Sequence, residues 1–149
     1  MKILVGIDAS EYSKAALEYV RKHPWPTGTR VIIFSAVQVP VMLSAEMYVP
    51  ASGAVDQILE DETRAHEELV SQAEQELRDA GFKTEGRVLR GDPRDAIVRA
   101  VQEAGADLVI VGSHGRTGLT KLVMGSVAAH VVAHAPCDVL VVKHGHDRS

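Results

Sequence analysis

Glycine and hydroxyl residues between positions 112 and 126 form the pattern in this sequence that is best suited to chemistry. A short apolar run is followed by Gly112, Ser113, His114, Gly115 and Arg116, and later by Gly125 and Ser126. A glycine lacks the Cβ atom that would block close approach of a phosphate group or strain a positive φ angle. A helix beginning at Ser126 would add free N–H groups and the positive end of its dipole. The pattern predicts a phosphate cradle, although glycines alone are equally able to shape a long loop.

Asp8 is the second candidate for a role in chemistry, because it directly follows an apolar run near the N-terminus. Its carboxylate could reach a ribose hydroxyl or a metal-bound phosphate. The alternative is that Asp8 caps the helix that comes next, which is a common role for aspartate at this position.

Five short segments are predicted to be β-strands that position these residues. Four are continuous apolar runs rich in β-branched residues, which is typical of strands buried on both faces. They span Ile3 to Val5, Val31 to Phe34, Leu108 to Val111 and Val139 to Val142. A fifth, near Phe82 to Leu89, carries Lys83, Glu85 and Arg87 at alternate positions. This charged alternation indicates a strand at the edge of the sheet.

Four helices are predicted between the strands from their start and stop signals. Ser10 can cap a helix that reaches about His23, and Asp92 followed by Pro93 begins one that closes at Gly105. A third runs from about Val55 to Ala80, and a last one from Ser126 to His134. The apolar face of the long helix is expected to hold Ile58, Leu59, Ala65, Leu69, Ala73 and Leu77.

The alternation of strands and helices predicts an α/β fold: a doubly wound, Rossmann-like, five-stranded parallel sheet of order 3-2-1-4-5 with helices on both faces. No linker or internal repeat divides the 149 residues, so we expect one domain over 1–149. In such sheets, ligands bind beyond the carboxyl ends of the strands where the winding changes direction. The crevice would lie between Asp8 and Gly112.

Composition narrows the classes of partner. The net charge is −4, and no stripe of Lys and Arg with interleaved aromatics indicates nucleic acid binding. Cys137 is the only cysteine, which excludes an intramolecular disulfide framework and a multi-cysteine metal site. The sequence has no long apolar span and its start lacks a signal-like apolar region, so we expect a cytoplasmic protein without membrane contact.

The segment from Gln38 to Ala54 does not fit the alternation of strands and helices. It combines apolar residues with proline and glycine breakers. Loops of this length inside compact domains are usually functional. We expect this one to cover a site or to pack on a neighbour.

The glycine spacing matches neither the P-loop pattern nor the G-x-G-x-x-G dinucleotide pattern. It is G-x2-G-x9-G-[ST], matched without a gap by Gly112, Gly115, Gly125 and Ser126. Together with the opening ILVGIDAS, the GDP turn at 91–93 and the ending PCDVLVV, it makes nearly the whole chain resemble the universal stress protein family, in particular its ATP-binding subset.

The resemblance implies a site for ATP with Mg. It implies that Asp8 approaches the ribose or the metal-phosphate end, and that the backbone near Ala36 meets the adenine, with Val111 and Leu89 lining the base. The phosphates would be wrapped by the glycine loop and the start of the last helix, namely Gly112, Ser113, His114, Gly115, Arg116, Gly125, Ser126 and Val127. Ser35-Ala36 departs from the His-Val of many relatives.

Three functions compete at this stage. The leading interpretation is a nucleotide-responsive regulatory module of stress survival, acting as a homodimer and on a protein partner that the sequence does not name. The second is an enzyme, a slow ATPase or a nucleotidyl transferase of the same fold superfamily, with His114 and Asp8 as candidates beside the γ-phosphate. The third is a structural dimer without nucleotide. The resemblance implies pairing through the last strand, over Val139, Leu140, Val141 and Val142, which is expected to form a sheet edge.

Overall fold

The computed structural model describes residues 1–39, 52–115 and 124–144, and it confirms the predicted α/β architecture. Five parallel strands form one sheet in the order β3-β2-β1-β4-β5. In chain order the elements are β1 (Lys2–Gly6), α1 (Glu11–Lys22), β2 (Arg30–Val37), α3 (Ser52–Asp79), β3 (Lys83–Arg90), α4 (Pro93–Ala104), β4 (Leu108–Gly112), α5 (Ser126–His134) and β5 (Asp138–Val142).

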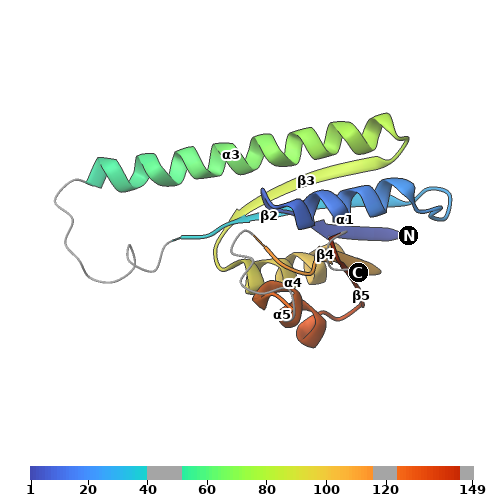
Figure 1. Cartoon of the computed structure of the whole chain (residues 1–149). Helices are drawn as coiled ribbons and strands as arrows, with labels where there is room; N and C mark the ends of the chain where they lie inside the picture. The colour runs from blue at the N-terminus through green and yellow to red at the C-terminus, as the bar shows by residue number, and fades with distance from the viewer. Residues whose placement is uncertain (40–51, 116–123, 145–149) are drawn as a thin grey trace.

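Helices cover both faces of the sheet, α1 and α3 on one side and α4 and α5 on the other (Figure 1). Alternate residues of β1 point to opposite faces, so Leu4 packs toward α4 and α5 while Ile3 and Val5 pack toward α1 and α3. All three of these side chains are fully buried. The core is therefore two apolar layers, built mainly from Val, Ile, Leu and Ala.

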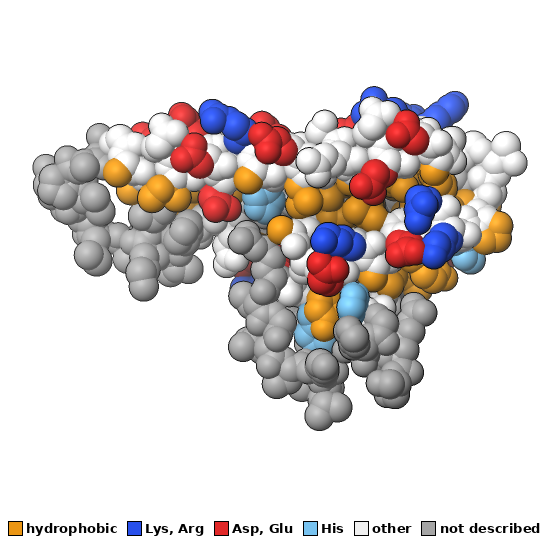
Figure 2. All heavy atoms as spheres, turned by 45° about the horizontal axis from the view of Figure 1, so that its top comes forward, with side chains coloured by type: hydrophobic (Ala, Val, Ile, Leu, Met, Phe, Trp, Pro, Cys, Tyr) orange, Lys and Arg blue, Asp and Glu red, His pale blue; other side chains and the backbone are white. Residues whose placement is uncertain are grey.

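The long helix α3 buries only part of the predicted face, since Ala73 and Leu77 are buried as expected. Its buried positions are His66, Val70, Ala73 and Leu77, whereas Ala65 is exposed and Ile58 is 53% exposed. The N-terminal half of the helix projects past the edge of the sheet (Figure 1), so the sheet does not cover Ile58. Charged side chains spread over the outer surface of α3, and hydrophobic ones gather beneath it (Figure 2). The outer face of α3 is therefore solvated.

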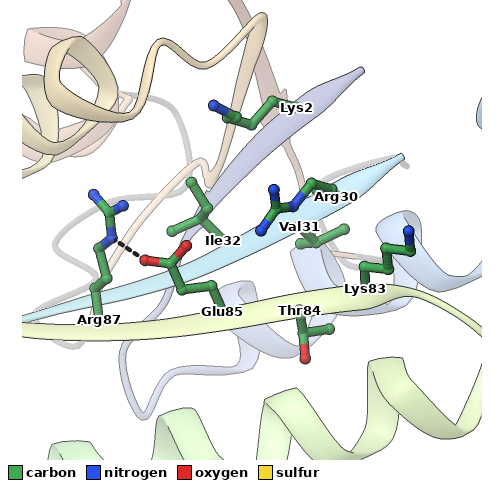
Figure 3. A pocket seen from close by; sticks show the side chains of 8 residues that line it. All are labelled: Lys2, Arg30, Val31, Ile32, Lys83, Thr84, Glu85 and Arg87. Carbon is green, nitrogen blue, oxygen red and sulfur yellow. Dashed lines mark hydrogen bonds and ion pairs between the residues drawn. The ribbon is translucent and has the colours of Figure 1, made fainter. Parts of the chain in front are cut away.

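Strand β3 is an edge strand, as its charges predicted. On the face turned away from α3, Lys2, Arg30, Glu85 and Arg87 surround a hollow of only about 60 Å³ (Figure 3). The Arg87 Nε donates to the Glu85 carboxylate at 2.7 Å, and the Lys2 Nζ donates to the Ala104 carbonyl at 2.7 Å. These charges leave the edge polar, which protects it against pairing with another strand.

Two sequence expectations fall wholly or partly outside the described residues. Most of the segment from Gln38 to Ala54 is not described: only its first two residues and its last three are, and the last three belong to α3, which begins at Ser52. Arg116 also lies outside the described residues. Among the helices that are described, none is long and apolar enough to cross a membrane.

Close packing of α3 on β3 depends on Gly86. A Cβ atom added there would lie 2.6 Å from the Val70 Cγ1 atom and would also overlap the Glu74 carboxylate. We expect Gly86→Ala to lower the free energy of unfolding by about 1–3 kcal/mol, because the helix must move away from the strand. Urea denaturation measures the change.

The matched control is Gly53→Ala, also a glycine of this helix–strand pair. In the part of the chain that the structure describes, nothing lies within 4 Å of a Cβ atom added to Gly53. Since alanine favours helix over glycine, this variant should be stabilised by about 0.5–1 kcal/mol. Equal stability changes in the two variants would contradict the packing argument.

Candidate functional site

A cleft of about 770 Å³ opens at the carboxyl ends of the strands, where the sequence predicted the crevice. Its floor consists of residues from β1, β2 and β4, and its sides come from α3, α4 and α5. Strand β1 pairs with β2 on one side and β4 on the other, so the winding of the chain reverses there. The volume is within the range that small-molecule ligands occupy, about 300–1,000 Å³.

The two ends of the glycine loop are joined beside this cleft. The Gly125 N–H donates to the Ser113 carbonyl at 2.7 Å, and the Ser113 N–H donates to the Val142 carbonyl at 2.9 Å. These bonds bring the end of β4 next to the start of α5. Gly125 is the N-cap of α5 and supplies no side-chain hydrogen bond to its N–H groups. The first turn of α5 therefore presents the positive end of a helix dipole to the cleft.

The glycines of this loop serve close approach and not positive φ. Among the described residues, the positive-φ glycines are Gly28, Gly81, Gly91 and Gly105. A Cβ atom on Gly112 would lie 2.6 Å from the Cβ atom of Tyr12, so Gly112 admits helix α1. Of the two roles that the sequence offered for these glycines, the described ones therefore serve close approach.

Gly115 and Gly125 pack against different kinds of neighbour. A Cβ atom on Gly125 would meet backbone, at 3.0 Å from the Ser113 carbonyl oxygen. Among the described residues, a Cβ atom on Gly115 would meet the Asp8 Oδ2 atom, at 2.9 Å. Gly125 thus closes the loop on itself, whereas Gly115 keeps the space beside the Asp8 carboxylate open.

Asp8 braces the turn between β1 and α1 and also lines the cleft. Its Oδ1 atom accepts from the Ser10 N–H at 2.9 Å and from the Ser13 hydroxyl at 2.8 Å. The N-cap of α1 is Ser10, whose hydroxyl accepts from the Ser13 N–H. Asp8 is therefore not the cap residue, and the alternative that the sequence left open is resolved in favour of Ser10.

Helix α3 contributes a buried histidine to the opposite wall of the cleft. The Ser35 hydroxyl donates to the Ile7 carbonyl at 2.9 Å and lies 2.6 Å from the His66 Nδ1 atom. Because a hydroxyl carries one hydrogen, Nδ1 is the donor in the second bond. The His66 Nε2 atom lies 4.0 Å from the Glu62 carboxylate, and both residues line the cleft.

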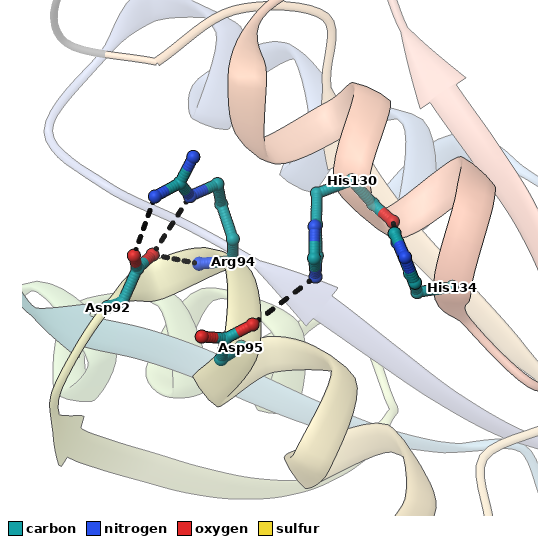
Figure 4. Close-up of polar contacts among 5 residues, drawn as sticks. All are labelled: Asp92, Arg94, Asp95, His130 and His134. Atoms are coloured by element: carbon teal, nitrogen blue, oxygen red, sulfur yellow. Dashed lines mark hydrogen bonds and ion pairs between the residues drawn. The ribbon is translucent and has the colours of Figure 1, made fainter.

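An ion pair between Asp92 and Arg94 lies where α4 begins (Figure 4), and both residues line the cleft. Asp92 is the N-cap of α4, as predicted, and its carboxylate accepts from the Arg94 N–H at 2.9 Å. The Arg94 Nε and Nη2 atoms donate to the same carboxylate at 3.1 and 2.8 Å. These side-chain bonds, and then the backbone bond, hold the pKa of Asp92 below its ordinary value.

The structure brings most of the predicted site residues together. The cleft is lined by Asp8, Ala36, Val111, Gly112, His114, Gly115, Gly125, Ser126 and Val127. Ser113 is buried behind the loop and does not line the cleft. Leu89, expected beside the base, also does not line it and is 41% exposed, because β3 is the outermost strand.

Sequence reasoning missed the cleft residues that α3 and α4 supply, among them His66, Glu62 and Arg94. For His66 a signal existed. It stands seven residues from both Leu59 and Ala73, and so in phase with an apolar face. For Arg94 the sequence gives no signal beyond its place two residues after the N-cap.

The reversed winding, the cleft and the exposed helix start define a doubly wound α/β protein with a cleft at the carboxyl edge of its sheet. Residues 1–143 match the family described as the universal stress protein family. The chain therefore belongs to that family, as its sequence motifs predicted.

Relatives cover nearly the whole chain. Universal stress protein MJ0577 of Methanocaldococcus jannaschii is 29% identical, over 95% of this chain and 94% of that protein. Universal stress protein Sll1388 of Synechocystis is 31% identical, over 96% and 97%. The solved structure of MJ0577 superposes with a TM-score of 0.82 at 29% identity, covering 96% of this chain and 95% of the other. A universal stress protein in complex with cAMP has a TM-score of 0.59 at 26% identity, covering 95% of each chain.

Removal of the Ser35 hydroxyl tests how much its hydrogen bonds to Ile7 and His66 stabilise the fold. Ser35 is 1% exposed, and Ser35→Ala leaves both the Ile7 carbonyl and the His66 Nδ1 without this partner. We expect the free energy of unfolding to fall by about 1–3 kcal/mol, because buried polar groups lose their hydrogen bonds. Chemical denaturation measures the change.

Thr84→Val is the matched control on the neighbouring strand. The Thr84 hydroxyl points toward α3 (Figure 3), and among the described residues it is buried without a hydrogen-bond partner. Its replacement by a methyl group should leave stability unchanged or raise it. A loss in Thr84→Val as large as that in Ser35→Ala would show that shape and not hydrogen bonding sets the result.

Proposed function

We propose that this member of the universal stress protein family binds ATP with Mg in the cleft and acts as a nucleotide-responsive regulatory module in the form of a homodimer. The observation that carries the proposal is the juxtaposition of Gly115, Asp8 and the uncapped start of α5 in one cleft. Each of these features was expected from the sequence pattern, and none of them is needed to build the sheet.

The dimensions and chemistry of the cleft suit a nucleotide. Its inner part is apolar, with Phe34, Ile97 and Val111 packed into the core beneath Ala36. A planar base could be buried there, while the backbone of Ala36 stands at the end of a strand with an edge open to hydrogen bonding. The phosphates would extend toward Gly115 and the N–H groups of Ser126 and Val127, where a helix dipole favours negative charge.

The residues present fit a magnesium ion that arrives with the phosphates. Mg²⁺ prefers oxygen ligands and is commonly held by one or two carboxylates together with substrate phosphates. Asp8 is a cleft carboxylate on the side of Gly115, where a Cβ atom would fill the space. Among the described residues no cluster of three or more His, Cys, Asp or Glu could hold a metal by itself. The phosphates would supply the remaining ligands.

A relative supports the nucleotide class. A protein 26% identical to this chain was solved in complex with cAMP, whose adenine, ribose and phosphate are the groups that the cleft features address. The proposal for this chain extends that class to ATP, because Gly115 and the N–H groups at the start of α5 can meet a longer phosphate chain.

Gly115→Val tests the cradle. The larger side chain would enter the cleft beside Asp8, and we expect it to weaken ATP binding at least about ten-fold, or about 1.4 kcal/mol. Isothermal titration with Mg-ATP gives the affinity, and release of inorganic phosphate in the same samples distinguishes binding from the competing ATPase interpretation. Gly125→Val is less informative, because its Cβ atom would meet the backbone of the loop itself.

Gly53→Val serves as the control, because it makes the same change in open space on α3. Its affinity for ATP should equal that of the wild type. Wild-type affinity in folded Gly115→Val would contradict the cradle. A wild type that binds no nucleotide would favour the third interpretation, a structural dimer.

The proposed dimer joins two copies through β5, the outermost strand opposite β3. Val139, Leu140 and Val141 are apolar and half-buried, and Asp138 at the start of β5 is the strand's one charged residue. This apolar stretch invites pairing, whereas β3 carries charges along its length that oppose it. We expect the two copies to meet at β5. We also expect the protein to act in the reducing cytoplasm and on a protein partner that the sequence does not name.

Val141→Lys should dissociate the dimer, because it places a charge in the proposed interface. Leu89→Lys is the matched control, since it makes a similar change on the other edge strand at a residue that is already 41% exposed. Sedimentation velocity should report a monomer for the first variant and a dimer for the second. A monomeric wild type, or dissociation by Leu89→Lys alone, would contradict pairing through β5.

A further inference from the structure

The charges around the cleft are unbalanced for a polyphosphate ligand. Among the described residues that line it, the carboxylates are Asp8, Glu62 and Asp92, and Arg94 is the one Lys or Arg. Each additional phosphate group adds negative charge near these carboxylates. Because these carboxylates repel phosphate groups, the Arg94 guanidinium is important for offsetting the negative charge in the cleft.

Helices α4 and α5 are in contact, and Arg94 lines the same cleft as the first turn of α5. The His130 Nε2 atom, in the second turn of α5, lies 3.4 Å from an oxygen of Asp95, in the first turn of α4. His130 is also close enough to Asp92 to act on its charge. Figure 4 shows the starts of the two helices next to each other, with the Asp92–Arg94 pair at the near end of α4.

Asp92 orients the Arg94 side chain but does not engage all of its N–H donors. Its Nε and Nη2 atoms form a two-point contact with Asp92, which fixes the plane of the guanidinium. Among the described residues the Nη1 atom makes no hydrogen bond, and half of the side chain is exposed. A guanidinium has five N–H donors in a fixed fork, so it can hold Asp92 and bind an anion together.

We propose that Arg94 is a specificity-determining residue that contacts the outer phosphates of the bound nucleotide and makes the cleft prefer nucleoside triphosphates and diphosphates to monophosphates. Asp92 is the positioning residue that orients it. The inference rests on the proposed function, and it gives α4 a role in recognition that the glycine pattern does not include.

Phosphate number is the readout that separates this role from a general effect of charge. Titration of Arg94→Gln with Mg-ATP, ADP and AMP should show ATP affinity reduced about ten-fold, ADP affinity reduced less, and AMP affinity within about two-fold of the wild type. Arg94→Lys keeps the charge but loses the fork, so it should recover only part of the ATP affinity.

Arg99→Gln is the matched control, because it removes the same charge from an exposed position of the same helix, outside the cleft. It should leave all three affinities unchanged. Equal losses in Arg94→Gln and Arg99→Gln would overturn the proposal, and so would equal losses for ATP and AMP in Arg94→Gln. If the wild type binds ATP and AMP and Arg94→Gln binds both with wild-type affinity, this inference alone is overturned. A wild type that binds none of the three would overturn the proposed function with it.

Discussion

Parallel pairing of β1 with both β2 and β4 is the constraint on which the site depends. The chain leaves β1 toward β2 and β3, and returns to the other side of β1 through α4 to form β4. The helices that follow β1 and β4, namely α1 and α5, therefore lie on opposite faces of the sheet, and the described residues leave a cleft at the carboxyl ends of these strands. The cleft is a consequence of this topology, and the residues after those strands line it by position.

Glycines in the strands allow the helices to pack closely on the sheet. A Cβ atom on Gly6 would lie 2.5 Å from the Ile97 Cδ1 atom, so α4 can pack under the centre of the sheet. Gly112 does the same for α1, and Gly86 for α3. Each glycine removes one side chain where a helix crosses a strand. The residues first noticed as parts of a ligand loop thus divide into two groups: Gly112 serves packing of the fold, whereas Gly115 borders the cleft.

The charges around the cleft determine which ligand charge it favours. A helix start without a side-chain cap attracts negative charge, while nearby carboxylates oppose it unless a cation arrives with the ligand or is held close by. The Asp92–Arg94 pair provides a fixed cation at the side of the cleft, and a magnesium ion would provide a mobile one. Both features relate affinity to the number of phosphate groups, which is the chemical difference among the adenine nucleotides of a cell.

The sequence by itself determined the features that are encoded within a few consecutive residues. The caps at Ser10 and Asp92, the order of strands and helices, and the glycine spacing could be read because each depends on local backbone geometry. Only the tertiary structure decided which side chains of different elements meet. The crossing of α3 over the sheet buried His66 and left Ala65 exposed, the outermost place of β3 kept Leu89 out of the cleft, and the contact between α4 and α5 brought Arg94 in. These outcomes depend on how helices pack across strands, and one-dimensional spacing does not specify that angle.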